Sequence, residues 1–225
     1  MDIGANLNQF VGDRKPDRRY TSFDYCFNYF QSFRADRITE IAAKKNMQLS
    51  CLHLGMFLAS WGMFRGSTVA LGRSAKQFEP VIELIADTPS DMWDIDAHGY
   101  TRGVCQQLIE QHRQIRESMR DPARPSRDPT TTLATKIMLG VFGNVPAYDD
   151  FFKRGRKSEG RTGAFGVRSL LQLGQFYQEH AEAIEAYRIP TLDFRTGQPT
   201  SLRYTRAKVL DMVFFIEGGG TGSKI

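Results

Sequence analysis

Apolar side chains recur along most of the chain three or four residues apart, which is the spacing of one face of an α-helix. Leu52, Met56 and Phe57 illustrate the pattern, and Arg65-Gly66 follows them as a helix-stop signal. The periodicity predicts a short helix opening at Asp36 and longer helices over 20–33, 49–64, 69–86, 100–119, 131–142, 146–153, 167–187 and 204–217. Alternating runs typical of strands are short and lack a tight hairpin turn. We therefore predict an all-α protein.

Three segments depart from the helical pattern. Residues 121–129 contain three prolines and cannot be helical throughout, because each proline disfavours a helical residue before it. Residues 155–163 are rich in glycine and basic residues, and we expect them to be mobile. The end of the chain, 218–225, predicts a flexible tail. The remainder, 1–217, has the length of one domain, which we expect to be a compact bundle of two helical lobes.

Composition narrows the class of protein. With 41% hydrophobic residues the chain can bury a substantial core. The cysteines Cys26, Cys51 and Cys105 are odd in number and widely spaced, which predicts reduced thiols in a cytoplasmic protein. No secretory signal pattern opens the chain, and its most apolar stretch, 49–71, contains Arg65. We expect neither a membrane span nor a membrane partner.

Basic residues are in modest excess but are unevenly distributed. Lysine and arginine number 30 against 25 acidic residues, a net charge of +5. Most of the excess lies in 14–19, 113–127 and 153–168. Basic clusters of this kind suit a polyanionic partner, although many basic proteins bind none.

Several kinds of chemistry are absent from the sequence. The four histidines share no ligand spacing with one another or with the cysteines, so we expect no metal. The glycine-rich segments do not follow a strand into a helix, and no nucleophile elbow is present. We expect no cofactor. What remains is a small set of carboxylates and lysines in apolar settings.

The most informative segment is 130–153. A proline-rich basic loop leads into an apolar helix that begins with threonines, carries Lys136 and ends at Gly140 or Gly143. Threonines at this position leave helix N-terminal amides for a phosphate. Val145-Pro146 then starts another helix, with Asp149 in its first turn between aromatic residues.

Each of these two charged residues also has an ordinary interpretation. From the residues alone, the favoured interpretation is that Asp149, or its neighbour Asp150, only caps the helix, because acidic residues are common in a first turn. The ordinary interpretation of Lys136 is a surface lysine, whose aliphatic stem packs on the protein while its ammonium group stays in water. A catalytic role for either residue therefore needs support beyond the local pattern.

The order of these features resembles the helix-hairpin-helix DNA glycosylases, a family of all-α enzymes. Lys136 and the sequence Val145-Pro146-Ala-Tyr-Asp149 are similar to the family's run from a hairpin through a helix to a Val-Pro-x-Asp-like turn. The likeness is greatest to the 8-oxoguanine-type and archaeal branch, and to bacterial anti-phage glycosylases that remove hypermodified cytosines. It implies that Asp149 assists loss of the base and that Lys136 stands near the position of a nucleophilic lysine.

The sequence departs from that family in two ways. Residues 125–129 replace the usual Gly-Val-Gly of the hairpin. Lys136 and Asp149 are closer in sequence than in the family, so that Thr131 or Thr132 falls at the lysine position. We therefore expect a monofunctional enzyme, in which Asp149 stabilises an oxocarbenium-like sugar or positions the attacking water. Lys136 would add an imine-forming step only if it reached the sugar with a lowered pKa.

A glycosylase must also hold its base between apolar walls after taking it out of the stack. Aromatic residues at helical spacing are more often core than pocket, and core packing is the alternative for every residue proposed here. The segment 61–67 is the best candidate for a pocket rim, because two glycines flank an arginine close to a tryptophan. The predicted base pocket consists of Tyr20, Tyr25, Trp61, Asp211 and Phe215.

Basic residues flank the proposed catalytic helix on both sides, and on one face they would neutralise several phosphates. A solvated surface is the alternative for each of them. The predicted DNA contacts are Arg65, Arg124, Arg127, Lys153, Arg154, Arg156 and Lys157.

Three hypotheses follow from the sequence. The first is a monomeric DNA glycosylase that leaves an abasic site, acting either on hypermodified phage bases such as glucosylated hydroxymethylcytosine in defence or on 8-oxoguanine in repair. The second is a helical DNA-binding protein without enzymatic activity, in which Asp149 is only a cap. The third is a helical interaction module or toxin without a nucleic-acid partner.

Overall fold

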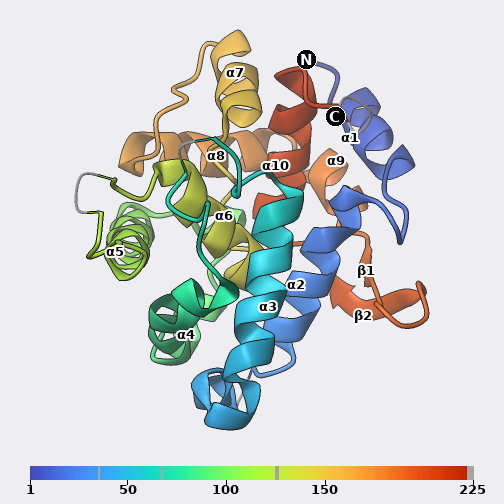
Figure 1. The fold of residues 1–225 in the computed structure, drawn as a ribbon. Coiled ribbons are helices and arrows are strands. Elements are labelled where there is room, and N and C mark those ends of the chain that lie inside the picture. Colours follow the sequence, from blue (N-terminus) through green and yellow to red (C-terminus); the bar gives the residue numbers. More distant parts are fainter. Residues whose placement is uncertain (35, 67, 125–126, 222–225) are drawn as a thin grey trace.

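The computed structural model describes residues 1–34, 36–66, 68–124 and 127–221, and it is predominantly helical (Figure 1). The α-helices are α1 (Ile3–Gly12), α2 (Ser22–Gln31), α3 (Lys44–Ser60), α4 (Glu79–Ala86), α5 (Arg102–Ser118), α6 (Thr131–Phe142), α7 (Asp150–Ser158), α8 (Val167–Glu179), α9 (Ala181–Ala186) and α10 (Arg206–Glu217). Short 3₁₀ helices cover Arg19–Thr21, Ile38–Ala42, Ala75–Phe78, Ser90–Trp93 and Ala97–Gly99. The strands are β1 (Pro190–Leu192) and β2 (Pro199–Arg203).

Helices α6 and α10 form the centre of the molecule. Every residue of α6 from Leu133 onward is buried, and so is every residue of α10 from Ala207 to Ile216. Local signals set the bounds of α6. The Thr130 hydroxyl accepts a hydrogen bond from the backbone N–H of Leu133, and Gly143 ends the helix with a left-handed φ of 67°. That bond occupies one of the amides that the sequence suggested for a phosphate.

Helix α7 packs against α10 with almost no space between their backbones. A Cβ atom added at Gly155 would collide with the carbonyl oxygen of Phe214, and one at Gly218 would collide with that of Phe151. Only glycine permits this approach. The expectation that 155–163 is a mobile loop is therefore wrong at its start, because Gly155 lies inside α7 and is buried.

The all-α class is confirmed, since the structure is predominantly helical, but the sequence did not predict the strands in residues 190–203, where β1 and β2 pair as an antiparallel hairpin. The Asp193 side chain accepts the backbone N–H groups of Arg195 and Thr196, and Gly197 closes the turn at a φ of 67°. The hairpin is attached to α2, because the buried Asp24 carboxylate accepts the backbone N–H of Leu192 at 2.8 Å.

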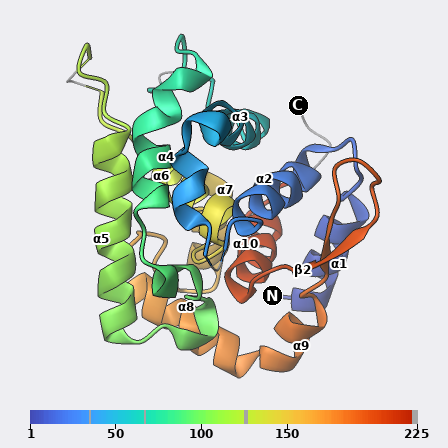
Figure 2. The same ribbon diagram turned by 90° about the horizontal axis from the view of Figure 1, so that it is seen from below.

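The other helices follow the prediction with shifted bounds. The predicted helix over 69–86 is helical only from Ala75, the one over 167–187 divides at His180, and α1 is not predicted at all. The three cysteines are buried free thiols. Figure 2 shows α5 and α8 on the side of α6 and α10 that is opposite α1 and the hairpin. Within the described ranges no helix has the length and apolar character needed to span a membrane.

Candidate functional site

A small cavity lies where the end of α3 meets α6, α10 and the start of α7. Its volume of about 10 Å³ is the space of a single water molecule. Four of the side chains around it are charged at neutral pH when they are not buried, which is an uncommon lining for the interior of a protein. The cavity is lined by Phe57, Trp61, Lys136, Leu139, Ala147, Asp149, Lys208, Asp211 and Phe215.

Lys136 and Asp149 face each other across one side of this cavity. The Lys136 Nζ lies 3.5 Å from Asp149 Oδ2 and donates a hydrogen bond of 2.9 Å to the carbonyl oxygen of Trp61. Asp149 is the N-cap of α7, and its Oδ1 accepts the N–H of Phe152 at 3.0 Å. A cation therefore stands at the C-terminal end of α3 and an anion at the N-terminal end of α7, both favoured by the helix dipoles.

These contacts decide between the two interpretations of each residue only in part. The Lys136 side chain is 4% exposed, so the expectation of a lysine that reaches solvent is wrong. Burial follows from the position of Lys136 in the fully buried part of α6. Asp149 does cap α7, as the ordinary interpretation has it, and its second oxygen also faces Lys136.

Burial changes the acid–base properties of this pair. Loss of water raises the pKa of the Asp149 carboxyl, and the Lys136 ammonium opposes that shift. Loss of water likewise lowers the pKa of Lys136, and the Asp149 carboxylate opposes that shift. Both residues are therefore easier to neutralise than their free counterparts, which is the property that general acid–base and nucleophilic groups require.

A second charged pair lies on α10. The Lys208 Nζ is buried and lies 2.9 Å from Asp211 Oδ2, and it stands 4.7 Å from the centre of the Phe10 ring. Asp211 Oδ1 accepts the backbone N–H of Ala147 at 2.9 Å, which fixes the turn that leads to Asp149. The sequence prediction included Asp211 and missed Lys208. A lysine three residues before an aspartate in an otherwise apolar helix is the signal that could have revealed it.

One wall of the cavity belongs to an aromatic cluster, which we define as Phe10, Tyr20, Trp61 and Phe215. Tyr20 stacks on Phe10 at 4.2 Å and on Trp61 at 5.6 Å, and Phe215 meets the Trp61 ring edge-on at 5.5 Å. Among the described residues, the Tyr20 hydroxyl and the Trp61 Nε1 are buried without a hydrogen-bond partner. Polar atoms left in this state cost stability unless a ligand or water satisfies them.

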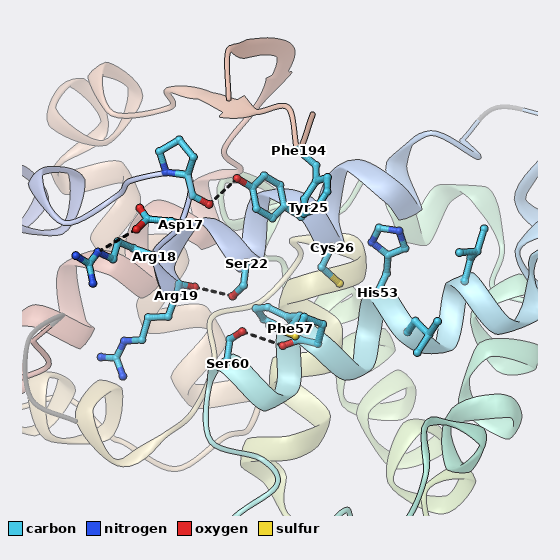
Figure 3. A pocket seen from close by; sticks show the side chains of 14 residues that line it. Asp17, Arg18, Arg19, Ser22, Tyr25, Cys26, His53, Phe57, Ser60 and Phe194 are labelled. Atoms are coloured by element: carbon cyan, nitrogen blue, oxygen red, sulfur yellow. Dashed lines mark hydrogen bonds and ion pairs between the residues drawn. The ribbon is translucent and has the colours of Figure 1, made fainter. Parts of the chain in front are cut away.

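Tyr25 does not belong to this site. Its hydroxyl donates a hydrogen bond to the carbonyl oxygen of Pro16, and its ring packs edge-on against Phe194 at 5.0 Å. It lines a separate groove between α2, α3 and the hairpin (Figure 3). Tyr20 stacks on Trp61 whereas Tyr25 lines this groove, a difference that helical spacing alone did not resolve.

The predicted DNA contacts are mostly at the surface. Lys153 is half-buried, and Arg154 donates a hydrogen bond to the carbonyl oxygen of Gly218. The exposed members are Arg65, Arg124, Arg127, Arg154 and Lys157. Residues 125 and 126 of the proline-rich segment, residue 67 of the predicted pocket rim and residues 222–225 of the predicted tail lie outside the described residues.

Arg156 is the exception, and its prediction as a DNA contact is wrong. It is 0% exposed, because α8 and α10 cover the side of α7 on which it lies. Its guanidinium donates to Gln172 Oε1 at 3.1 Å and stands 5.1 Å from the centre of the Phe214 ring. Burial lowers the pKa of Arg156 to about 10.

In the part of the chain that the structure describes, histidine, cysteine, aspartate and glutamate side chains form no group of three or more that could hold a metal ion. Comparisons with protein-family models, with curated proteins and with solved structures found no match to this chain.

Proposed function

We propose that this chain is a monofunctional DNA glycosylase of the helix-hairpin-helix type, which excises a damaged or hypermodified base and leaves an abasic site. The observation that carries the proposal is the pair of buried Lys136 and Asp149, whose side chain is 14% exposed; they lie 3.5 Å apart beside a cavity walled by Trp61, Phe215 and Asp211. A carboxylate held in an apolar, aromatic setting is what cleavage of an N-glycosidic bond requires.

Asp149 is the catalytic residue in this proposal. The bond between the sugar C1′ and the base nitrogen breaks, and the base leaves with the electron pair and takes up a proton from solvent. Water then adds its oxygen to C1′ and gives a proton to Asp149, which releases it to solvent and returns to the carboxylate. The negative charge of Asp149 stabilises the cationic sugar before that addition. This electrostatic interaction is strong because little water reaches the carboxylate.

Lys136 acts through Asp149. Its ammonium lies against the carboxylate and against the Trp61 carbonyl oxygen, and so it opposes the rise in the pKa of Asp149 that burial causes. A role as a nucleophile would require Lys136 to lose its proton and leave both partners, and the proposal does not include it.

The aromatic cluster provides the walls of the base pocket. A cavity of about 10 Å³ cannot admit a nucleobase, so Trp61 must move aside when the base enters. Gly62 and Gly66, with left-handed φ values of 77° and 63°, bracket the turn that follows Trp61 and allow such a movement. The Tyr20 hydroxyl and Trp61 Nε1 would then find hydrogen-bond partners on the base.

A second candidate is a DNA-binding protein without enzymatic activity. The observation that favours it is the N-cap hydrogen bond from Phe152 to Asp149, which by itself explains an aspartate at this position. In this candidate Lys136 serves only to neutralise the cap.

One pair of variants separates the two candidates. Asp149→Asn keeps an oxygen for the cap and removes the charge, whereas Asp150→Asn changes the exposed neighbouring carboxylate, whose side chain is 86% exposed. Duplexes with 8-oxoguanine, uracil or glucosylated hydroxymethylcytosine are incubated with each protein, and abasic sites are measured. We expect Asp149→Asn to lower the excision rate by at least about 100-fold with unchanged DNA binding, and Asp150→Asn to have no effect.

DNA binding by the wild-type protein without abasic product on any of these substrates would favour the non-enzymatic candidate. Borohydride trapping tests the role of Lys136 separately. A covalent protein–DNA adduct would contradict the monofunctional assignment, and its absence together with excision would support it.

A further inference from the structure

A larger concave surface runs along the outside of α2 and α3 (Figure 3). It encloses about 560 Å³, and we call it the α2–α3 groove. Its floor contains Cys26 and Phe57, and the tip of the hairpin closes one side with Phe194. Phe57 also lines the cavity beside Asp149, so the groove and the cavity lie on two sides of the same ring.

The groove exposes an unusual amount of apolar surface. Phe194 is 73% exposed and Met56 is 67% exposed, and Leu49 and Leu52 on the same helix are each about half exposed. Apolar side chains gathered in one concave patch mark a binding surface more often than scattered ones do. The Phe194 and Tyr25 rings meet edge to face and form one wall, and His53 lies on the opposite side (Figure 3).

The hydroxyl groups that line the groove each donate a hydrogen bond to a backbone carbonyl oxygen of the protein. Ser22 Oγ donates to the Arg19 carbonyl, Ser60 Oγ to the Met56 carbonyl and Tyr25 Oη to the Pro16 carbonyl. The lining therefore offers flat apolar faces but no hydroxyl donor to read the edge of a ligand. The apolar and aromatic faces suit stacking of a base.

Cations stand at the end of the groove that is nearest the cavity. Arg18 and Arg19 line this end together with Asp17, and the Arg19 guanidinium lies 5.2 Å from the centre of the Trp61 ring. The Arg18–Asp17 pair is exposed, with a separation of 3.7 Å, and so it contributes little and leaves Arg18 available for another anion. Phosphate groups fit this charge.

From these features we infer that the α2–α3 groove binds an unpaired nucleobase of the DNA, stacked on the Phe194 ring beside Tyr25, with a neighbouring phosphate at Arg18. The inference depends on the proposed function only for the class of partner. It adds that the protein engages a single-stranded or locally opened strand next to the base that enters the cavity.

Phe194 provides the test, because its exposure makes its replacement harmless to the fold. Phe194→Leu keeps apolar volume and removes the ring face, whereas Phe194→Trp keeps a ring. Leu71→Ala, at an exposed apolar residue outside the groove, is the matched control. Binding of a fluorescently labelled single-stranded oligothymidylate, and of an oligomer of the same length made of abasic units, is measured by anisotropy at one fixed salt concentration.

We expect Phe194→Leu to weaken binding of the oligothymidylate by about tenfold. Phe194→Trp and Leu71→Ala should bind like the wild type. Binding of the abasic oligomer should not change in any variant, because it offers phosphates but no bases.

Wild-type protein that fails to bind the oligothymidylate would overturn the inference and would leave the groove to an apolar protein segment. Equal losses on both oligomers, or no loss in Phe194→Leu, would also overturn it. The result is independent of catalysis. Groove-dependent binding without any abasic product would contradict only the glycosylase proposal, whereas excision that depends on Asp149 but not on Phe194 would contradict only the groove.

Discussion

The cavity beside Asp149 and the α2–α3 groove lie on two sides of Phe57 and differ in almost every property. The cavity has room for one water and is lined by two largely buried ion pairs, Lys136–Asp149 and Lys208–Asp211. The groove is many times larger, is apolar and is open to solvent. The charged side chains thus lie in the cavity, where little water reaches them, and the exposed apolar side chains lie in the groove.

Charged side chains are usually exposed and apolar ones buried, and these two regions show the reverse. The region with buried charges therefore depends more on the rest of the fold. Buried charges require partners, and the chain supplies them from four different elements: α3, α6, α7 and α10. Exposed apolar side chains need no such support and can be changed at little cost to stability. Substitutions in the two regions should therefore have very different effects.

The largest effect is expected when one partner of the buried pair is removed. Lys136→Met leaves the Asp149 carboxylate without its cation and should lower the free energy of unfolding by about 3–5 kcal/mol. Lys157→Met, at an exposed lysine of α7, should change it by less than about 0.5 kcal/mol. Urea denaturation of both variants checks this. Equal stabilities of the two variants would show that the Lys136–Asp149 pair does not need its charge.

A smaller effect is expected at the aromatic cluster. Trp61 is half-buried between Tyr20 and Phe215, so Trp61→Ala should cost about 2–3 kcal/mol, somewhat less than a fully buried tryptophan. Met56→Ala, one turn earlier on α3 but in the groove, should cost less than about 0.5 kcal/mol. Thermal or urea unfolding compares them, and a groove variant as unstable as Trp61→Ala would remove the distinction between the two regions.

The pH dependence of stability should reveal the buried pair. Burial raises the pKa of Asp149, so its stabilising contribution is present at low pH and is lost as pH rises through that pKa. Burial lowers the pKa of Lys136, so its contribution is present at high pH and is lost as pH falls through that pKa. The wild type, relative to the double variant Lys136→Met/Asp149→Asn, should therefore be least stable between the two pKa values.

Urea denaturation of both proteins at several pH values measures that difference, and we expect it to vary by about 1–2 kcal/mol. The charge-conserving variant Asp149→Glu serves as a control, because it should keep the minimum near neutral pH. A difference that does not vary with pH would contradict the assigned directions of the two pKa shifts.

The smallest effect concerns the surface arginines. Arg154→Gln removes an exposed cation and should leave stability nearly unchanged, while the slope of log binding constant against log salt for DNA should become less steep by about 0.9. Arg156→Gln, two residues later, should lower stability and leave that slope unchanged, because the guanidinium is buried. A change in slope for Arg156→Gln would restore it as a DNA contact.

Local signals in the sequence were sufficient for much of the fold. The bounds of α6 are those predicted, since a threonine caps its start and a left-handed glycine ends it. The hairpin was missed because its strands are short and its turn uses Asp193 and Gly197 rather than a two-residue Asn-Gly turn. Helix α1 was missed although Asp2 caps its start and Gly12 ends it, because the polar residues 6, 8 and 9 interrupt its apolar pattern.

The motif in 130–153 predicted two residues of the candidate site, and the expected base pocket added three more. Lys136, Asp149, Trp61, Asp211 and Phe215 all lie around one cavity. Arg156 could not be predicted, because the burial of α7 depends on α8, and periodicity along one helix does not tell which neighbour covers each side. Lys208, by contrast, could have been predicted, because it precedes Asp211 by three residues in an otherwise apolar helix.

The closed cavity has a consequence for timing in the proposed reaction. If only a fraction of the molecules has Trp61 displaced at any moment, the apparent affinity for a base is reduced by that fraction. A flipped-out base that restacks quickly in the duplex is then lost before Trp61 moves. A poorly stacked base stays outside the duplex for longer and can enter the cavity. Selection among bases would thus depend on two times: the time that Trp61 takes to move aside and the lifetime of the unstacked base.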